Sequence, residues 1–214
     1  MKFDFIRGLL FDNDGVLVDS RPAVDAAWNQ WASEFGVTFQ MNETFHGRRA
    51  EDIVRLLLSA DQFERGNNRI NQLEQETASQ TSALDGAVSL TSSLPAGTWT
   101  VVTSANPQLA RARLAAAGIP IPSAPVTAAD VAKGKPSPDP YLLGAERLSI
   151  PIQNCAVFED APAGYQAGVA AGAGLVVGVG PLALQTDARV VVKSLEGIKL
   201  TTEGLEIVDS ARLR

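Results

Sequence analysis

The sequence predicts an α/β fold, a three-layer doubly wound parallel sheet, with a small α-helical domain inserted after the first strand. From Ala83 onwards, short apolar runs alternate with helical segments, which is the pattern of successive βαβ units. Between Val18 and Ala83 no strand-like run occurs and the periodicity is helical. We therefore expect a core of residues 1–16 and 83–214 and a helical insertion of residues 17–82.

Composition restricts the class of protein. The 214 residues are 45% hydrophobic and 20% charged, which is typical of a globular protein with a sizeable core. A net charge of −6 argues against nucleic acid or an anionic membrane as partner. The start MKFDFIRG has no signal-peptide pattern and no apolar run is long enough to span a membrane, so we expect a cytoplasmic protein, monomeric or weakly dimeric. The single cysteine, Cys155, excludes an internal disulfide and is expected in the core.

The first strand is predicted at the apolar run that ends in Phe11, and two carboxylates follow it directly, Asp12 and Asp14. Ligands of open α/β sheets bind beyond the carboxyl ends of the strands. Side chains two apart can point to the same side, and two such carboxylates share either a proton or a cation. Oxygen ligands without His or Cys favour Mg²⁺. A solvated Asp-Asn-Asp-Gly turn is the alternative interpretation.

The remaining elements follow from periodicity and from start and stop residues. In the insertion, a helix is expected from Pro22 to a stop at Gly36, with two more at 49–58 and 62–81. In the core we expect strands at 99–103, 155–158, 175–179 and 189–192, and helices at 107–117, 138–148 and 162–171. The chain beyond Leu195 gives little indication of its structure.

Polar residues recur where these strands end. Thr103 and Ser104 follow one strand and bring a hydroxyl and free backbone N–H groups to its end, although helix capping would also explain them. Glu159 and Asp160 follow another, and a buried strand brings such neighbours to a cleft. The proline-rich loop between these strands contains Lys135.

Four stretches together resemble the motifs of the haloacid dehalogenase superfamily, in the order of that family. FDNDGVLVDS is similar to motif I and Thr103 to the hydroxyl of motif II. GKPSPDPY is similar to motif III and VFEDAPAGYQAG to motif IV. The resemblance covers residues 8–172 and implies that family's Rossmann-like core, with the helical insertion as a cap.

The resemblance also implies roles for the motif residues. Asp12 would be the nucleophile that forms an aspartyl phosphate, and Asp14 the general acid and base. Thr103 would hydrogen-bond the phosphoryl group, and Lys135 would pair with both phosphate and nucleophile, whereas Lys133 would be a surface residue.

The same resemblance implies a magnesium site and substrate contacts. Its metal residues would be Asp12, Asp14 through its backbone carbonyl, Asp160 directly, and Glu159 directly or through water. Ser104 would contribute its backbone N–H, and we place Ala105 beside it among the substrate-binding residues. A shift of one residue in the register would exchange the roles of Thr103 and Ser104.

A branch within the superfamily is indicated by the segment FHGRRAED, which resembles the cap segment of the 2-deoxyglucose-6-phosphate, glycerol-3-phosphate and hexitol-phosphate phosphatases. His46, Arg48 and Arg49 are therefore candidate substrate contacts, and at most one of the adjacent arginines should point into the cleft. We predict an Mg²⁺-dependent phosphatase that acts on a small phosphorylated sugar or polyol.

Other activities fit the residues less well. Asp14 argues against a dehalogenase, and the absence of lysine between Lys2 and Lys133 removes the Schiff-base lysine of the phosphonatases. A β-phosphoglucomutase-like mutase is the first alternative, although its cap lysine and first-cap-helix histidine are missing. A non-catalytic phosphate-binding protein is another alternative. The G-x-G-x-x-A pattern at 178–183 could indicate a dinucleotide site, but we interpret it as a loop.

Overall fold

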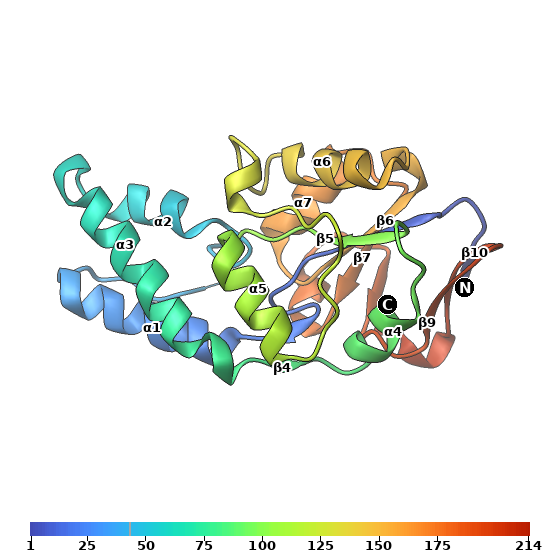
Figure 1. The fold of residues 1–214 in the computed structure, drawn as a ribbon, viewed down its shortest axis with the longest axis horizontal. Helices are drawn as coiled ribbons and strands as arrows, with labels where there is room; N and C mark the ends of the chain where they lie inside the picture. The colour runs from blue at the N-terminus through green and yellow to red at the C-terminus, as the bar shows by residue number, and fades with distance from the viewer. Residues whose placement is uncertain (43) are drawn as a thin grey trace.

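The computed structural model describes residues 1–42 and 44–214, and a five-stranded parallel sheet is its central feature (Figure 1). The strands lie in the order β5 (Trp99–Val101), β2 (Gly8–Phe11), β6 (Cys155–Glu159), β7 (Leu175–Val179) and β8 (Val190–Val192). The first strand of this sheet thus lies inside it, between later strands on both sides. This is the predicted doubly wound α/β architecture.

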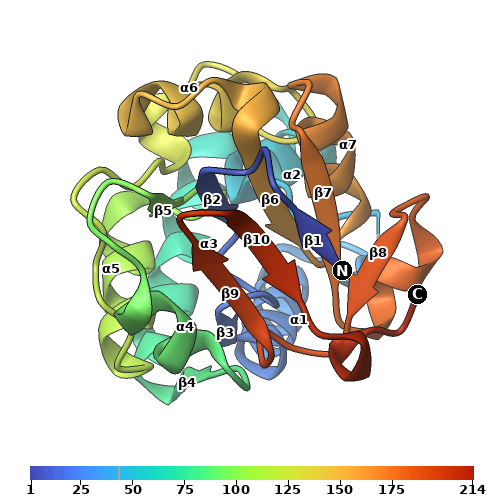
Figure 2. The ribbon, with the colours of Figure 1, turned by 90° about the vertical axis from the view of Figure 1, so that its right-hand side faces the viewer.

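The two faces of the sheet pack against different helices because side chains alternate along each strand. Leu9 and Phe11 face a core shared with α4 (Ala87–Ser93) and α5 (Pro107–Ala116). Leu10 and Cys155 face the opposite core, which is covered by α6 (Asp139–Leu148) and α7 (Pro162–Ala170). Figure 2 shows α4 and α5 on one side of the strands and α6 and α7 on the other. Cys155 is buried and free, as expected.

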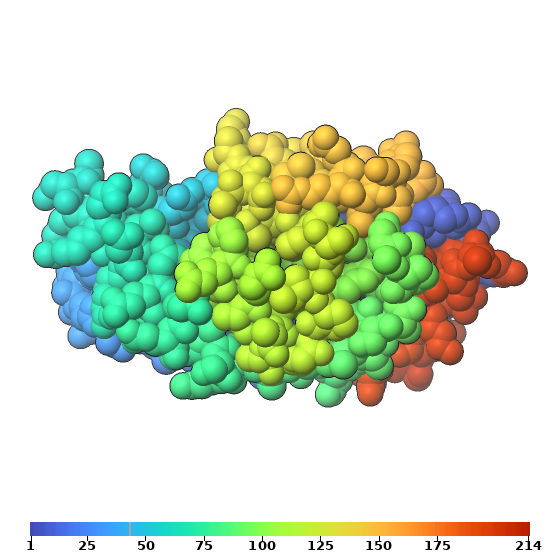
Figure 3. Space-filling view, in the orientation of Figure 1, coloured from blue at the N-terminus to red at the C-terminus, as the bar shows by residue number. Residues whose placement is uncertain are grey.

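The insertion forms a helical lobe at one end of the elongated molecule (Figures 1 and 3). It consists of α1 (Arg21–Phe35), α2 (Ala50–Leu57) and α3 (Ala60–Thr77). The lobe has its own apolar cluster around Trp28 and Trp31, and the Trp31 indole donates a hydrogen bond to the Gly66 carbonyl at 2.8 Å. Among the described residues, no helix is both long and apolar enough to cross a membrane.

A short antiparallel pair, β3 (Val18–Asp19) and β4 (Ser82–Ala83), joins the two chain segments that lead into and out of the lobe. These strands were not expected, and they lie at the edges of the predicted insertion. The limits 17–82 remain a prediction.

Several other boundaries differ from expectation. Helix α3 begins two residues earlier than predicted and ends at Thr77, after which a single 3-10 turn, η1 (Ala78–Gln80), leads to β4. Strand β5 ends at Val101 and is extended only by an isolated bridge at Val102. Further 3-10 turns are η2 (Ala128–Asp130), η3 (Ile152–Asn154), η4 (Pro181–Gln185) and η5 (Asp209–Ala211).

A three-stranded antiparallel sheet near the chain ends was not predicted. It consists of β1 (Lys2–Phe3), β10 (Gly204–Ile207) and β9 (Ile198–Thr201), and Figure 2 shows it in front of the main sheet. Leu205 and Ile207 are buried in the same core as β2. Strands of two to four residues carry little periodicity, and the pairing of β1 with β10 joins opposite ends of the sequence.

The burial of β10 predicts that Leu205→Ala destabilises the protein by roughly 2–5 kcal/mol, because the substitution leaves a cavity in the core. Urea unfolding followed by circular dichroism measures this. Leu213→Ala is the matched control, because Leu213 is 40% exposed, and it should change the free energy of unfolding by less than about 0.5 kcal/mol. Equal effects of the two substitutions would show that β10 does not belong to the core.

Candidate active site

The parallel register brings the predicted motif residues to one edge of the sheet. Phe11 lies opposite Val101 on one side and Phe158 on the other. The Asp12 amide continues this ladder by donating to the Phe158 carbonyl at 3.0 Å, so Asp12 and Glu159 are neighbours at the strand ends. The order of strands in the sheet therefore produces a site from residues far apart in the sequence.

Lys135 provides the positive charge at the centre of this site. Its ammonium group donates to Asp12 Oδ1 at 2.7 Å, to Glu159 Oε1 at 2.6 Å and to the Val102 carbonyl at 2.9 Å. Burial alone would lower the pKa of Lys135, but the charges of the two carboxylates outweigh burial and raise that pKa. Lys135 is therefore a permanent cation, whereas Lys133 is exposed, as expected.

Tyr141 is a member of this cluster that the sequence did not reveal. Its buried hydroxyl donates a short hydrogen bond to Glu159 Oε1. The second oxygen of that carboxylate, Oε2, is buried and has no hydrogen-bond partner among the described residues. The only hint in the sequence was the position of Tyr141 at the end of the stretch GKPSPDPY.

The residues fit a divalent cation. Asp12, Glu159 and Asp160 each offer an oxygen, and these oxygens lie within 4.8 Å of one another. Burial raises the pKa of Asp12 and that of Asp160 to about 7, against the partial compensation of Lys135 and Arg21. With Glu159 Oε2 still unpaired, this buried oxygen set suits a hard cation such as Mg²⁺.

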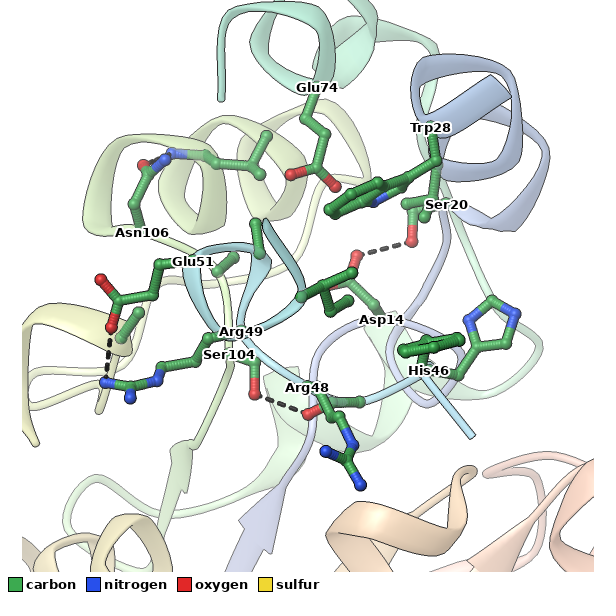
Figure 4. A pocket seen from close by; sticks show the side chains of 18 of the residues that line it. Asp14, Ser20, Trp28, His46, Arg48, Arg49, Glu51, Glu74, Ser104 and Asn106 are labelled. Carbon is green, nitrogen blue, oxygen red and sulfur yellow. Dashed lines mark hydrogen bonds and ion pairs between the residues drawn. The ribbon is translucent and has the colours of Figure 1, made fainter. Parts of the chain in front are cut away.

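Asp14 is directed elsewhere. Its Oδ1 accepts a hydrogen bond from the Ser20 hydroxyl at 2.5 Å (Figure 4). The same oxygen accepts from Arg113 Nη1 at 2.9 Å. The Asp14 carboxylate is not part of the cluster of three oxygens, so the structure leaves only the predicted backbone carbonyl for metal binding. Nothing in the sequence pointed to Arg113, which is one of two arginines on α5.

The end of β5 carries the polar groups that were expected there. The Thr103 hydroxyl accepts from the Ala105 amide at 3.1 Å, and the Ser104 hydroxyl donates to the Gly47 carbonyl at 2.7 Å, which joins core and lobe. Asn106 caps α5 by accepting from the Leu109 amide at 2.9 Å. The roles of Thr103, Ser104 and Ala105 toward a substrate remain predictions.

A cavity of about 270 Å³ lies between the core and the lobe. Figure 4 shows part of its lining, with Asp14 and Ser104 of the core and His46, Arg48 and Glu74 of the lobe. The lining combines acidic residues of the sheet edge with polar residues of both parts, among them Asp12, Asp14, Asp160, His46, Arg48, Asn67, Asn71, Glu74, Ser104 and Ala105. Thr103, Lys135 and Glu159 are buried and do not belong to this lining. The cavity is thus acidic at the sheet edge and polar toward α3.

The two adjacent arginines differ in their surroundings. Arg49 forms ion pairs with Glu51 at 2.9 Å and Asp52 at 2.8 Å, and it also donates to the Val131 carbonyl at 3.3 Å. Arg48 has a buried Nε without a partner among the described residues. His46 and both arginines line the cavity. Because the Arg49 guanidinium is already paired with two carboxylates, Arg48 is the better candidate for a substrate contact.

Comparison with known proteins agrees with this arrangement. Residues 6–172 match the family model of the haloacid dehalogenase-like hydrolases. The chain is 40% identical over 205 residues to hexitol phosphatase A of Escherichia coli, covering 92% of this chain and 95% of the relative. It is 33% identical to glycerol-1-phosphate phosphohydrolase 2 of Saccharomyces cerevisiae, covering 80% of this chain and 74% of the relative.

Among solved structures, β-phosphoglucomutase from Clostridium difficile superposes with a TM-score of 0.77 and 24% identity, covering 89% of this chain and 92% of that chain. At this identity the likeness bears on the fold alone. The helical lobe and the sheet therefore have a close structural counterpart, whereas the reaction of that relative is not transferred.

The buried carboxylates predict a pH dependence of stability for the metal-free protein. The folded-state pKa of Asp12 and of Asp160, about 7, lies above the ordinary value of 3.8, so the folded state binds protons that the unfolded state has lost. In chelator, the thermal midpoint should therefore fall as pH rises from about 5.5 to 7.5. Mg²⁺ should raise the midpoint more at the higher pH, because it replaces those protons.

Asp160→Asn is the control for this measurement, because it removes one of the raised pKa values and should flatten the dependence. A midpoint in chelator that stays constant or rises over this interval would contradict the assignment.

Proposed function

The chain belongs to the haloacid dehalogenase-like hydrolase family and is a phosphoric monoester hydrolase, and on this premise we propose that it is an Mg²⁺-dependent phosphatase of small sugar or polyol phosphates. The observation that carries the proposal is the Asp12 carboxylate, held by the buried Lys135 ammonium at 2.7 Å beside two further carboxylates. A nucleophilic carboxylate and a phosphate repel each other unless cations neutralise them. Lys135 supplies one such charge permanently.

The proposed reaction has two steps. An Asp12 oxygen attacks phosphorus, the bond from phosphorus to the ester oxygen breaks, and Asp14 gives its proton to the leaving alkoxide. Water then attacks the phosphorus of the aspartyl phosphate, Asp14 takes a proton from that water, and the Asp12 carboxylate is regenerated as inorganic phosphate leaves. Mg²⁺, held by Asp12, Glu159, Asp160 and the Asp14 carbonyl, would supply electrophilic stabilisation of the phosphoryl oxygens.

Other groups at the strand ends would position the phosphate. The Thr103 hydroxyl and the backbone N–H groups of Ser104 and Ala105 are the proposed phosphoryl contacts. Lys135 already contacts Asp12 and Glu159, so it would orient the nucleophile as well as neutralise the phosphate. His46 and Arg48 would contact the substrate from the lobe, where both line the cavity. Arg49 would act less directly, because Glu51 and Asp52 occupy its guanidinium.

The cavity supports a polyhydroxylated substrate. Beyond the sheet edge its walls include the amides of Asn67, Asn71 and Asn106, which suit hydroxyl groups. Relatives that are 40% and 33% identical are named for hexitol phosphatase and glycerol-1-phosphate phosphohydrolase activity. The mutase alternative has less support, because the lobe contains no lysine and its one histidine, His46, precedes α2 rather than lying on α1.

Phosphate release from a panel of hexitol, glycerol, hexose and 2-deoxyhexose phosphates tests this proposal. Wild-type protein should release phosphate with Mg²⁺ and lose the activity in chelator. Asp12→Asn should lower kcat by roughly 10³-fold or more, because the nucleophile is lost. Lys135→Ala should lower it by roughly 10²–10³-fold through loss of charge stabilisation.

Lys133→Ala is the matched control and should leave kcat unchanged, because Lys133 is exposed and lies outside the cluster. Isomerisation of a hexose phosphate without phosphate release would instead establish the mutase alternative.

A further inference from the structure

Arg113 on α5 lies between two carboxylates that belong to different parts of the molecule. Nη1 donates to Asp14 Oδ1 in the core at 2.9 Å, and Nη2 donates to Glu74 Oε1 on lobe helix α3 at 3.3 Å. Arg113 is 3% exposed and Glu74 is 7% exposed. One buried guanidinium thus connects the proposed general acid to the lobe.

Each contact depends on the other, because the two carboxylates share the charge of one guanidinium. Burial raises the pKa of Glu74, and the Arg113 charge acts against that rise. Removing one partner of a buried ion pair leaves an uncompensated charge, which is strongly unfavourable. Where α3 lies therefore decides how much of the Arg113 charge remains for Asp14. The third donor, Nε, is buried without a partner among the described residues, so no further bond fixes the guanidinium.

The second anchor of Asp14 is also connected to the lobe. The Ser20 hydroxyl donates to the same Oδ1 atom at 2.5 Å, and Ser20 immediately precedes α1. Asn13 Nδ2 contacts the other carboxylate oxygen at 3.4 Å, which is long for a hydrogen bond. The short bonds to the Asp14 carboxylate therefore come from Ser20, which precedes lobe helix α1, and from Arg113, which is paired with lobe helix α3.

We propose that Arg113 is a positioning residue that couples the docking of α3 to the orientation of the Asp14 carboxylate. The proposal rests on the function above, in which Asp14 protonates the leaving alkoxide. Arg113 itself transfers no proton. It sets the direction from which Asp14 reaches the leaving oxygen, and Glu74 transmits the position of the lobe to it.

Leaving-group dependence distinguishes this role from a general loss of structure. An alkoxide needs a proton as it leaves, whereas p-nitrophenolate leaves without one. Hydrolysis of the aspartyl phosphate also uses Asp14 and is common to all substrates, so the comparison is made on the first step, as the single-turnover rate of leaving-group release. Arg113→Met should lower this rate at least 10-fold for a sugar or polyol phosphate that the wild type hydrolyses, and less than 3-fold for p-nitrophenyl phosphate. The enzyme concentration that gives half the maximal single-turnover rate should stay within 3-fold of wild type for both substrates, and Asp14→Asn should show the same contrast.

Two further variants keep the test independent of folding. Glu74→Gln retains the shape and an acceptor oxygen, and it should give the same contrast at smaller size. The double variant Arg113→Met/Glu74→Gln leaves no unpaired charge at Glu74, so it should unfold at a higher temperature than Arg113→Met. Its single-turnover rate of leaving-group release should nevertheless match that of Arg113→Met, because each substitution breaks the same connection between Glu74 and Asp14.

Arg111→Met, an exposed position on the same helix, is the matched control and should leave both substrates unaffected. Equal losses on the two substrates, no loss on either, or additive effects of the two substitutions would overturn the role of Arg113. Absence of phosphate release by the wild type would instead overturn the proposed function, and the inference with it.

Discussion

The ion cluster at the ends of β2 and β6 is the constraint on which the rest of the structure depends. Asp12, Glu159 and Asp160 are all buried, and a buried carboxylate is unfavourable by several kcal/mol unless it is compensated. Lys135 bonds to two of them, and Tyr141 donates to Glu159 from α6. The loop before α6 and the packing of α6 on the sheet are thus fixed by the same charges that form the site.

The backbone must also make room for this cluster. A side chain at Gly15 would place its Cβ 2.1 Å from Asp160 Oδ2, and one at Gly164 would place it 1.8 Å from Glu159 Oε1. Gly15 also has φ +82°, a conformation that favours glycine. The carboxylates therefore approach the backbone closely on both sides, and this shape accounts for the glycine in each of the two acidic motifs.

The sequence predicted those features of the fold and site that depend on neighbouring residues in the chain, and it did not predict those that depend on contacts between distant segments. Asp12, Glu159 and Asp160 each directly follow an apolar strand, so a correct α/β topology was enough to bring them together. Arg113 and Glu74 lie on different helices, and neither helix shows their pairing. The same holds for β1 and β10, whose pairing joins Lys2 to Glu206. Contacts between distant polar side chains depend on tertiary docking, and sequence periodicity reports only which face of one helix is apolar.

The contacts between lobe and core are polar, and this bears on how the cavity is closed. Ser104 reaches Gly47, Asn106 donates to Asn71 at 3.0 Å, Arg49 reaches Val131 and Arg113 reaches Glu74. Interfaces between domains of one chain are generally more polar than cores, and such domains can move relative to each other. The cluster itself has two kinds of compensation. Lys135 is 2% exposed, and its displacement would leave the buried carboxylates of Asp12 and Glu159 without a counter-charge. Arg21, at the start of α1, pairs with Asp160 at 2.5 Å but its side chain is 39% exposed, so water can replace this partner at small cost. The charge of Lys135 is therefore permanent, whereas the charge that Arg21 contributes from the lobe is exchangeable, so Arg21 is the partner of Asp160 that a cation can displace.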